Sequence, residues 1–543
     1  MNDQNLKQTI TEITDSDPEH KTASVIKYVG LALFVAGLMI SCAALTMNNY
    51  QLTAGVLQKT ITNQSQRAAV QKAWQPNTGK IYNTEFPFIH DLRGALKKAN
   101  NQLKKQNKIN PYQQKELRMY ITKAAGTGFL NNHLWLIFGL TFGVTCLGAL
   151  IYIVPRWWIR LPGIQNDHIY HNPVTRGRVV GLIMGSFLIV LYVLLYWAPA
   201  YLANWIRLVD PISFALSGQQ ASQWFFYGFM YTLAVLVMGV RMFIKYRHSN
   251  YHLIRTASLI FFQTAFAFLI PQILIALNKP SYDFKNIWPL NYEFFFNYKL
   301  HAFTHSGSIG LFMLFWGIAL IIIGVPVITY FYGKRWYCSW VCGCGGLAET
   351  FGDPHRQLSD KSLGAWQIER WLIHSILVFV VVMTAGVLYS YFSGNGTLLG
   401  ISTYSIRSIY GFVIGSIFSG VIGVGFYPFM GNRVWCRFGC PLAAYLGIVQ
   451  RFKSRFRITT NGGQCISCGN CSTYCEMGID VRWYAQRGQN IVRASCVGCG
   501  VCASVCPRGV LRLENGPEEG RFNEPKAFTI TDDGIEMNDE LVA

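Results

Sequence analysis

Eight of the fifteen cysteines lie near the C-terminus, in two runs of the form C-x2-C-x2-C-x3-C. The first run is Cys465, Cys468, Cys471 and Cys475, and the second is Cys496, Cys499, Cys502 and Cys506. This spacing is typical of bacterial proteins with two [4Fe–4S] clusters, because one short loop brings three thiolates to a cluster and the fourth cysteine ligates the other cluster. We therefore predict one cluster on Cys465, Cys468, Cys471 and Cys506. We predict the other on Cys475, Cys496, Cys499 and Cys502.

Zinc and disulfides are the alternative explanations of these eight cysteines. A structural zinc site needs four ligands rather than eight in this repeat. Disulfides are rare in a reducing compartment, where metal sites of this kind belong. The pattern favours two clusters, and the interspersed glycines Gly469, Gly498 and Gly500 let backbone N–H groups approach the sulfur atoms. Glu476 replaces the proline that usually follows the first run, a departure that we expect to leave ligation unchanged.

A second repeat carries four more cysteines in two C-x3-C pairs. Gly333-Lys334-Arg335-Trp336-Tyr337-Cys338-x3-Cys342 recurs 98 residues later as Gly431-Asn432-Arg433-Val434-Trp435-Cys436-x3-Cys440. If the copies face each other, Cys338, Cys342, Cys436 and Cys440 could hold a third iron–sulfur cluster. A redox-active thiol set and plainly buried cysteines remain open as alternatives. Cys344 could replace Cys342 as a ligand, whereas the isolated Cys42 and Cys146 are expected to be packing residues.

Long apolar stretches must position these motifs. Only 14% of the 543 residues are charged, against about 25% in soluble domains. Eight stretches are long enough to span a bilayer: 27–47, 133–154, 179–200, 222–244, 255–277, 306–332, 371–392 and 408–430. We predict an all-α polytopic membrane protein with a C-terminal α+β two-cluster bacterial ferredoxin domain. The net charge of +20 is explained by basic residues that flank spans, so we expect no nucleic-acid partner.

Charge bias between spans predicts the orientation and the domain order. Lys and Arg are concentrated after spans two, four, six and eight, which places both termini in the cytoplasm of a bacterium and the protein in its inner membrane. No cleavable signal peptide is evident. The expected order is a cytoplasmic tail (1–26), span one (27–47), an extracytoplasmic segment (48–132), spans two to five (133–277), an extracytoplasmic loop (278–305), spans six to eight with the C-x3-C pairs (306–457), the ferredoxin domain (458–515) and an acidic tail (516–543).

The segment 48–132 carries 13 Lys and Arg against 3 Asp and Glu. Its pattern is mostly helical, with Pro76, Pro87 and Pro111 as expected helix breakers. Two interpretations stay open. The segment is either a solvated helical cap or a docking face for an acidic electron-transfer partner, since charge complementarity raises encounter rates.

Histidines near membrane depth are functional candidates. His374 lies one turn inside span seven, near the cytoplasmic cysteines, and His301 and His305 lie one turn apart before span six. A histidine can exchange the protons that accompany quinone chemistry, because its pKa lies near neutrality. We therefore take His374 as the catalytic candidate, against the alternative of an interfacial residue that solvates a helix end. His168, His171, His248 and His252 are expected to be solvated, and Arg176, Arg178, Arg433 and Arg437 to mark the membrane surface.

The C-terminal half resembles a known family. Ser339-Trp340-Val341 within the first pair, the Trp435-Cys436-x3-Cys440-Pro441 sequence and the double C-x2-C run are similar to the NapH/NosR membrane polyferredoxins, which are linked to periplasmic nitrate reductase and to nitrous-oxide reductase. The oxidase-assembly ferredoxin CcoG is a more distant resemblance. The match covers about residues 300–515. Gly343 stands where the family has proline, and 48–132 is too short for the flavin-binding domain of the NosR type.

The motifs and the resemblance imply an iron–sulfur electron-transfer protein. The resemblance implies quinol oxidation, or electron transfer across the inner membrane to a periplasmic reductase. A quinol-dehydrogenase-type oxidoreductase subunit is one hypothesis, with a cytoplasmic donor as the other source of electrons. The alternative is an assembly factor that supplies electrons to metal or cofactor sites of another respiratory enzyme. A redox sensor is weaker, because the tail after Asn515 is too short for an output domain.

Overall fold

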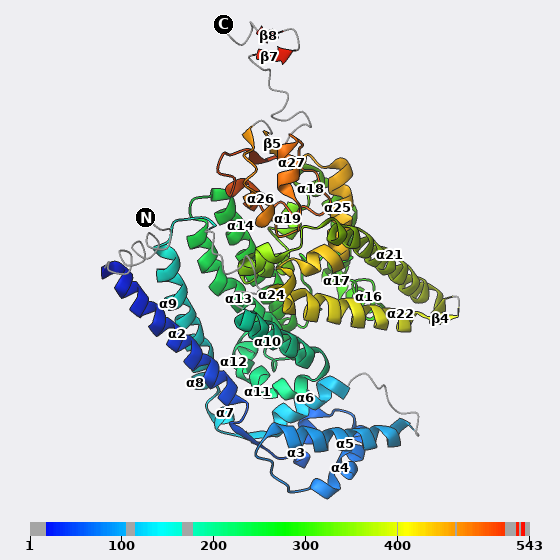
Figure 1. Ribbon diagram of the computed structural model, residues 1–543. Coiled ribbons are helices and arrows are strands. Elements are labelled where there is room, and N and C mark those ends of the chain that lie inside the picture. The colour runs from blue at the N-terminus through cyan, green and yellow to red at the C-terminus, as the bar shows by residue number, and fades with distance from the viewer. Residues whose placement is uncertain are drawn as a thin grey trace. The chain divides into compact units, whose positions relative to one another are not determined.

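The computed structural model describes residues 18–104, 114–164, 178–398, 400–461, 464–515, 528–531 and 534–537, and it is mostly helical (Figure 1). Most of the predicted tails, 1–26 and 516–543, lie outside the described residues, as do Pro111, His168, His171 and Arg176. The described chain divides into two compact units. The first draws on Met1–Pro162, Ser186–Arg247 and Gln263–Asp283, and the second on Gly163–Gly185, His248–Phe262 and Phe284–Ala543.

Eight helical stretches among the described residues are long and apolar enough to cross a membrane. They are Val25–Ala44, Leu134–Trp158, Val179–Trp197, Gln223–Lys245, Asn250–Ala276, Gly307–Tyr332, Leu363–Ser393 and Thr403–Gly425. Each corresponds to one predicted apolar stretch, with shifted ends. The seventh, α21, begins at Leu363 rather than at 371, because Ser362 caps it by accepting the backbone N–H of Ala365. Its charged residue Glu369 is tolerated in the helix because it pairs with Arg437.

Several spans combine α-helical and π-helical pieces. Their parts are α8 (Leu134–Phe138), η3 (Gly139–Gly143) and α9 (Val144–Trp158); α14 (Asn250–Phe261), η6 (Phe262–Leu269) and α15 (Ile270–Ala276); α17 (Gly307–Ala319), η7 (Leu320–Gly324) and α18 (Val325–Tyr332); and α22 (Thr403–Tyr410), η9 (Gly411–Ile422) and α23 (Gly423–Gly425). The unbroken spans are α2 (Pro18–Ala44), α10 (Arg178–Trp197), α13 (Gln223–Lys245) and α21 (Leu363–Ser393).

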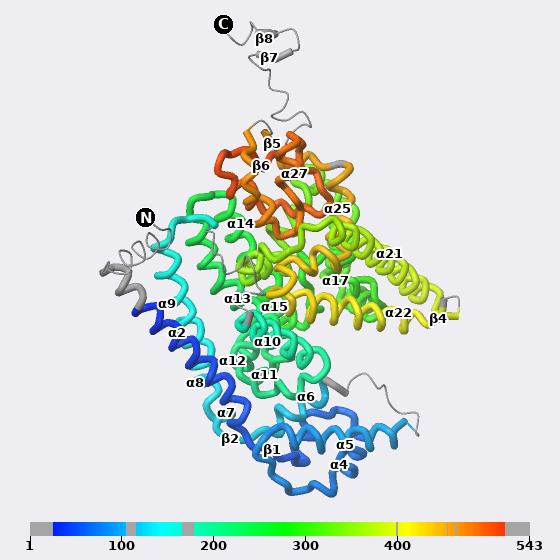
Figure 2. The backbone as a smooth tube through the Cα atoms, viewed as in Figure 1, coloured from blue at the N-terminus to red at the C-terminus, as the bar shows by residue number. Residues whose placement is uncertain are grey.

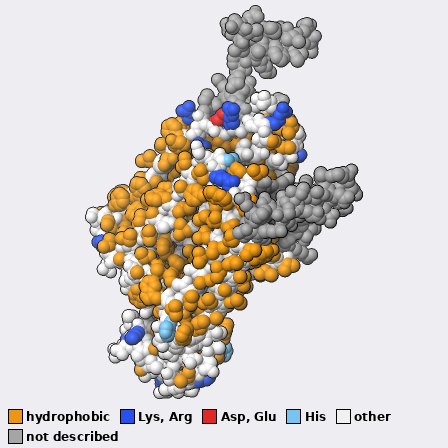
Figure 3. All heavy atoms as spheres, turned by 90° about the vertical axis from the view of Figure 1, so that its left-hand side faces the viewer, with side chains coloured by type: hydrophobic (Ala, Val, Ile, Leu, Met, Phe, Trp, Pro, Cys, Tyr) orange, Lys and Arg blue, Asp and Glu red, His pale blue; other side chains and the backbone are white. Residues whose placement is uncertain are grey.

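In the first unit, α2 runs beside α9 (Figure 2). A Cβ added to Gly30 would lie 2.5 Å from Tyr152 N, and one added to Gly148 would lie 2.3 Å from Phe34 N. The two backbones therefore approach as closely as small residues allow, the usual way in which spanning helices pack. In Figure 3, hydrophobic side chains gather over the middle of the face drawn, whereas Lys and Arg side chains lie mainly toward its ends. Exposed apolar residues such as Val35, Leu38 and Leu147 on these helices suit a lipid environment.

The segment between α2 and α8 folds around its own core. Strand β1 (Asn48–Tyr50) pairs antiparallel with β2 (Gly126–Gly128), so the segment begins and ends at one place. Its helices are α3 (Ala54–Thr60), α4 (Gln64–Trp74), α5 (Glu85–Lys104), α6 (Gln114–Ala125) and α7 (Phe129–Asn132). Tyr50, Trp74 and Phe88 are buried in its core. Pro87 does not break a helix as predicted, because it lies in the first turn of α5, where proline is tolerated.

In the second unit, short elements follow the spans. They are α16 (Asn297–His305), α19 (Arg335–Cys338), α20 (Gly343–Thr350), η8 (Asp353–Leu358), α24 (Tyr427–Met430), η10 (Trp435–Gly439) and α25 (Pro441–Lys453). Strand β5 (Phe456–Thr460) then pairs antiparallel with β6 (Leu511–Asn515) in the register Phe456↔Asn515 to Thr460↔Leu511. Between these strands lie α26 (Asn470–Thr473), α27 (Val481–Gln486) and α28 (Val501–Ser504). The strands thus close a helical C-terminal region around the eight C-x2-C cysteines.

The remaining elements are small. In the first unit they are η1 (Gln75–Asn77), η5 (Pro199–Leu202), α11 (Ala203–Leu208) and α12 (Asp210–Ser217). In the second unit, β3 (Thr397–Leu398) pairs with β4 (Ile401–Ser402), and β7 (Phe528–Thr531) pairs with β8 (Gly534–Met537), both antiparallel.

Candidate metal centres

The two C-x3-C copies share several local features, although the first cysteine lies in the α-helix α19 in one copy and in the π-helix η10 in the other. Gly333 and Gly431 end the preceding helices α18 and α24 with positive φ values of 64° and 90°. Cys342 and Cys440 are the residues that precede α20 and α25. The backbone N–H of Cys342 donates to Tyr337 O at 2.8 Å, and that of Cys440 donates to Trp435 O at 2.9 Å. The sequence repeat is therefore also a structural repeat.

The four C-x3-C cysteines are buried in one large core cluster, which also contains Cys471, Cys496 and Cys502. The four lie close enough to one another that, beyond the effect of burial, each of Cys338, Cys342 and Cys436 raises the pKa of Cys440. Burial raises the pKa of Cys338 to about 12, and the neighbouring Cys342 and Cys436 add to the rise. Burial also raises the pKa of Cys440 well above its usual value, with Cys436, Cys342 and Cys338 contributing. A hydrogen bond from Cys344 lowers the pKa of Cys342 to about 6. Cys342 is therefore the thiol that loses its proton most easily. The buried thiols with raised pKa values would lose theirs readily only beside a positive charge such as a metal ion.

The C-x2-C cysteines line two separate small cavities. The first is lined by Cys465, Cys468, Cys471 and Cys506. The second is lined by Cys475, Cys496, Cys499 and Cys502. The last cysteine of each run thus lies with the first three of the other run, the grouping that the spacing predicts. Gly469 and Gly500 precede α26 and α28 with φ values of 80° and 83°, so the two runs begin their helices in the same way.

The surroundings of these sulfur atoms suit iron–sulfur clusters. Backbone N–H groups point at sulfur: Ile479 N lies 3.4 Å from Cys475 Sγ, and Ser472 and Gly498 donate to Cys471 and Cys496. In the C-x3-C copies, Gly345 donates to Cys342 and Ala443 donates to Cys440. These donors stand three residues after their cysteine in both copies. All-thiol donor sets with N–H groups aimed at sulfur fit [4Fe–4S] clusters, and that clusters occupy them stays a prediction.

A larger cavity adjoins the C-x3-C cysteines. It has a volume of about 490 Å³ and is lined by His374, Glu369, Trp366 and Cys436, among others. We call it the His374 cavity. The His374 Nδ1 lies 2.6 Å from Arg370 O. Because a carbonyl only accepts, Nδ1 carries the proton in the neutral ring, which leaves Nε2 able to accept one. Glu369 accepts from Arg437 Nε at 2.7 Å and from the Ser495 hydroxyl.

The other predicted residues lie elsewhere. His301 and His305 lie on α16 with ring centroids 5.7 Å apart, and neither lines the His374 cavity. Cys344 contacts Cys342 and is half-buried. Cys42 is exposed and Cys146 is half-buried on their spans. His248 is exposed, whereas the prediction that His252 is solvated is wrong: its side chain is 2% exposed, because α14 packs it into the second unit.

Sequence reasoning missed a buried network of arginines and acids. Arg433 and Arg437 do not mark the membrane surface as predicted, because both are buried and paired with carboxylates. Arg433 pairs with Glu349 and Glu476, and Arg356 pairs with the same two glutamates. Glu476, at the position where proline is usual, is fully buried. Burial alone would raise the pKa of Glu349, but Arg255, Arg356 and Arg433 hold it well below its usual range.

Comparison with protein families matches the two cysteine regions separately. A model described as a 4Fe-4S binding domain matches residues 314–362 and again 412–459. These two matches each contain one C-x3-C pair. A model described as a 4Fe-4S dicluster domain matches residues 464–511, which contain the eight C-x2-C cysteines. The chain therefore carries ferredoxin-type 4Fe–4S domains in its C-terminal half.

Three curated relatives align with part of the chain. YccM of Escherichia coli K12, a protein proposed to act in electron transport, is 25% identical over 181 residues, which are 30% of this chain and 47% of that protein. The methylamine utilization ferredoxin-type protein MauN is 27% identical over 28% of the chain in Methylobacillus flagellatus, and 28% identical over 30% in Paracoccus denitrificans. The alignments cover 53% and 56% of those proteins. The chain thus spans about half the length of these relatives, and no solved structure matches it.

Proposed function

We propose that the chain is an iron–sulfur electron-transfer protein of the bacterial inner membrane that exchanges electrons between quinol and a redox partner. The observation that carries the proposal is that Cys436 and His374 line the same cavity. The eight apolar helices and the ferredoxin-type domains support a membrane electron carrier. We assign the C-terminal domain the α+β fold of two-cluster ferredoxins, and we place both termini in the cytoplasm. The resemblance to the NapH/NosR type belongs to the same proposal.

Three cysteine sets would hold the cofactors. The two cavities lined by C-x2-C cysteines each supply four thiols, and the C-x3-C cysteines supply a third set. A [4Fe–4S] cluster bound at each set would accept and release one electron at a time. The chain's own contribution is to bury the thiols and to aim backbone N–H groups at their sulfur atoms.

The His374 cavity has the chemistry that a quinol headgroup needs. Oxidation of a quinol to a quinone releases two electrons and two protons. His374 Nε2 can accept a proton, and the Glu369 carboxylate lies on the same cavity. Trp366 and Phe452 provide apolar surface for the ring, and Cys436 places the C-x3-C site at the cavity wall. His374 Nε2 and the electron-accepting site would therefore both adjoin a quinol ring placed in this cavity.

The test is anaerobic reduction of the purified full-length protein by a soluble menaquinol analogue, followed by electron paramagnetic resonance. We expect the clusters to be reduced, and we expect His374→Phe to slow reduction by roughly 100-fold without loss of iron. His305→Phe is the matched control and should leave the rate unchanged. If quinol fails to reduce the clusters while dithionite does, electrons enter from a cytoplasmic donor and the quinol assignment is wrong. An unassembled respiratory enzyme in a deletion strain that retains normal quinol oxidation would favour the assembly-factor alternative.

A further inference from the structure

Three arginines and three acids form a network inside the second unit, described here as the arginine–glutamate network. Its members are Arg255, Arg356, Arg433, Glu349, Glu476 and Asp353, each at most 4% exposed. The Glu349 carboxylate forms ion pairs with all three arginines. The N···O distances are 3.0 Å to Arg255 Nη2, 2.7 Å to Arg356 Nη2 and 2.7 Å to Arg433 Nη2. The members come from α14, α20, η8 and the segments beside η10 and α26. The network therefore ties together elements that are far apart in the chain.

Two arginines of this network reach sulfur atoms of two different cysteine sets. Arg433 Nη1 lies 3.7 Å from Cys436 Sγ and donates to Cys338 O at 3.1 Å. Arg356 Nη1 lies 3.7 Å from Cys499 Sγ. Cys436 belongs to the C-x3-C cysteines and Cys499 to the second C-x2-C cavity. Each site therefore has one buried guanidinium against one of its sulfur atoms.

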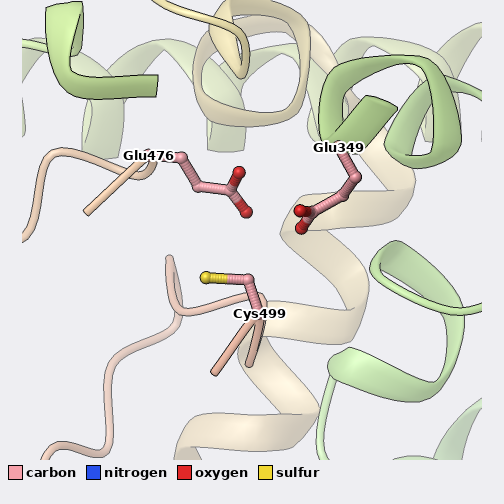
Figure 4. Close-up of side chains that lie close together, drawn as sticks. All are labelled: Glu349, Glu476 and Cys499. Atoms are coloured by element: carbon pink, nitrogen blue, oxygen red, sulfur yellow. The ribbon is translucent and has the colours of Figure 1, made fainter. Parts of the chain in front are cut away.

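The same two arginines share both glutamates. Glu476 accepts from Arg356 Nη1 at 2.8 Å and pairs with Arg433 Nη2 at 3.1 Å. Glu349 pairs with both as well. Figure 4 shows the carboxylates of Glu349 and Glu476 and the sulfur of Cys499 turned toward one space. The carboxylate oxygens of the two glutamates and the Cys499 sulfur lie within 4.8 Å of one another. Because arginine guanidinium groups already pair with both carboxylates, we do not assign a separate metal site to these three residues.

We propose that Arg433 and Arg356 set the reduction potentials of the C-x3-C site and of the second C-x2-C site, and that Glu349 and Glu476 moderate both. The proposal rests on the proposed function, because it requires iron–sulfur clusters at these cysteines. Each added electron makes a cluster more negative by one charge. A guanidinium beside a ligand sulfur stabilises that charge, and a nearby carboxylate opposes it. Burial makes both effects large, since no water screens them.

The signs of the expected shifts are opposite for the two kinds of residue. Arg433→Gln should lower the potential of the C-x3-C site more than that of the second C-x2-C site, and Arg356→Gln should do the reverse. We expect about a tenfold fall in the equilibrium constant for reduction in each case, which is about 59 mV for a one-electron couple. Glu476→Gln removes a negative charge shared by both arginines, so it should raise both potentials. A purely structural role would not give shifts of opposite sign.

The test is a redox titration of the intact protein in detergent, monitored by electron paramagnetic resonance. The matched control for the C-x3-C site is Arg335→Gln, because Arg335 occupies the position equivalent to Arg433 in the other repeat copy but bonds to Asn515 and to Tyr332 O instead. Site-selective downward shifts for the two arginine variants, an unchanged C-x3-C potential for the control and an upward shift for Glu476→Gln support the proposal. Equal shifts at all sites, or none, overturn it.

If an arginine variant loses its cluster, Glu476→Gln alone carries the test, since it leaves both guanidinium groups in place; an unchanged or lowered potential then overturns the proposal. Failure of the proposed function is distinguishable, because dithionite but not the menaquinol analogue would then reduce the clusters, and the titration would still report their potentials. If the C-x3-C site instead holds no cluster, its signal would be missing in the unaltered protein. In that case Arg356→Gln and Glu476→Gln still test the second C-x2-C site, and unshifted potentials there overturn the inference.

Discussion

Cys342 and Cys440 hold equivalent places in two copies of one local structure. Each precedes a helix, and each donates its backbone N–H to the carbonyl five residues earlier, at 2.8 Å and 2.9 Å. Each sulfur receives an N–H from the residue three positions later, Gly345 or Ala443. Because this geometry is repeated, we interpret the four C-x3-C cysteines as one common site rather than as four separate buried thiols.

Cys468→Ser should remove the cluster from the first C-x2-C cavity. Serine supplies no thiolate, and the remaining three cysteines cannot complete the ligand set. We expect a loss of about four iron atoms per chain and lower thermal stability of the C-terminal domain, measured by iron analysis and by thermal unfolding. Cys42→Ser is the control, since Cys42 is an exposed residue of a span. Unchanged iron content in Cys468→Ser would refute the ligand assignment.

The double change Cys338→Ser and Cys436→Ser should leave both C-x2-C sites loaded and stop electron transfer from quinol. It removes one thiol from each repeat copy and leaves the two C-x2-C cavities untouched. Electron paramagnetic resonance of the dithionite-reduced protein counts the surviving signals, and quinol-dependent reduction gives the activity. Comparing Cys342→Ser with Cys344→Ser identifies the ligand, because only the ligand's loss should remove iron. Surviving quinol activity in the double variant would make the C-x3-C site structural.

Gly345→Ala should disrupt the C-x3-C site through the backbone alone. A Cβ at this position would lie 2.0 Å from Cys338 O and 3.1 Å from Arg433 Nη1. Relieving that clash means displacing buried backbone beside two ligands, which we expect to destabilise the unit by roughly 1–3 kcal/mol and to reduce iron at this site. Gly364→Ala is the control, because nothing lies within 4 Å of a Cβ there. Full iron content in Gly345→Ala, with wild-type unfolding, would contradict the placement of Gly345.

The segment between β1 and β2 should become less stable as the pH rises. Burial raises the pKa of Glu85 to about 8, partly offset by the hydrogen bond from the Tyr50 hydroxyl. An unfolded glutamate titrates near 4.3, so between these values the folded state binds the proton and the unfolded state does not. The contribution of Glu85 to stability is therefore fully present below about pH 4.3, falls through the window up to about pH 8, and is constant above it.

Two measurements check the state of Glu85. Infrared difference spectra should show a protonated carboxyl at pH 6 that titrates near pH 8 and is absent in Glu85→Gln. Pulse proteolysis in urea should show a midpoint for this segment that falls between pH 5 and pH 8 in the wild type. The midpoint should be nearly constant in Glu85→Gln, which keeps the shape of the neutral acid. A carboxyl that is ionised at pH 6 would contradict the burial of Glu85.

The sequence predicts those structural features that are determined by residues close together in the chain. Long apolar runs must become helices where lipid offers no hydrogen bonds, and eight such helices are present among the described residues. Cysteine spacing also acts locally, since a ligand loop of fixed length wraps one cluster. The spacing therefore predicts that Cys506 and Cys475 each group with the opposite run, and each lines the cavity of that run in the structure.

The arginine–glutamate network could not be predicted, because its partners are distant in sequence. Arg433 meets Glu349 across 84 residues, and Arg356 meets Glu476 across 120. From sequence alone, an arginine after a span is expected at the membrane surface, and nothing local to Arg433 shows that two carboxylates will enclose it. Glu476 in place of proline was the one available signal. Glu476 directly follows the predicted ligand Cys475. A charged residue at such a place is not buried without a partner, so the sequence could have predicted an arginine beside it.

The most direct test of the central claim, that the C-x3-C cysteines hold a third cluster, is the iron and acid-labile sulfide content of the anaerobically purified full-length protein. Three [4Fe–4S] clusters predict about 12 iron and about 12 sulfide per chain, falling to about 8 of each when Cys338 and Cys436 are both replaced by serine. A content of about 8 in the unaltered protein, unchanged in the double variant, would contradict the account and leave the C-x3-C cysteines as structural thiols.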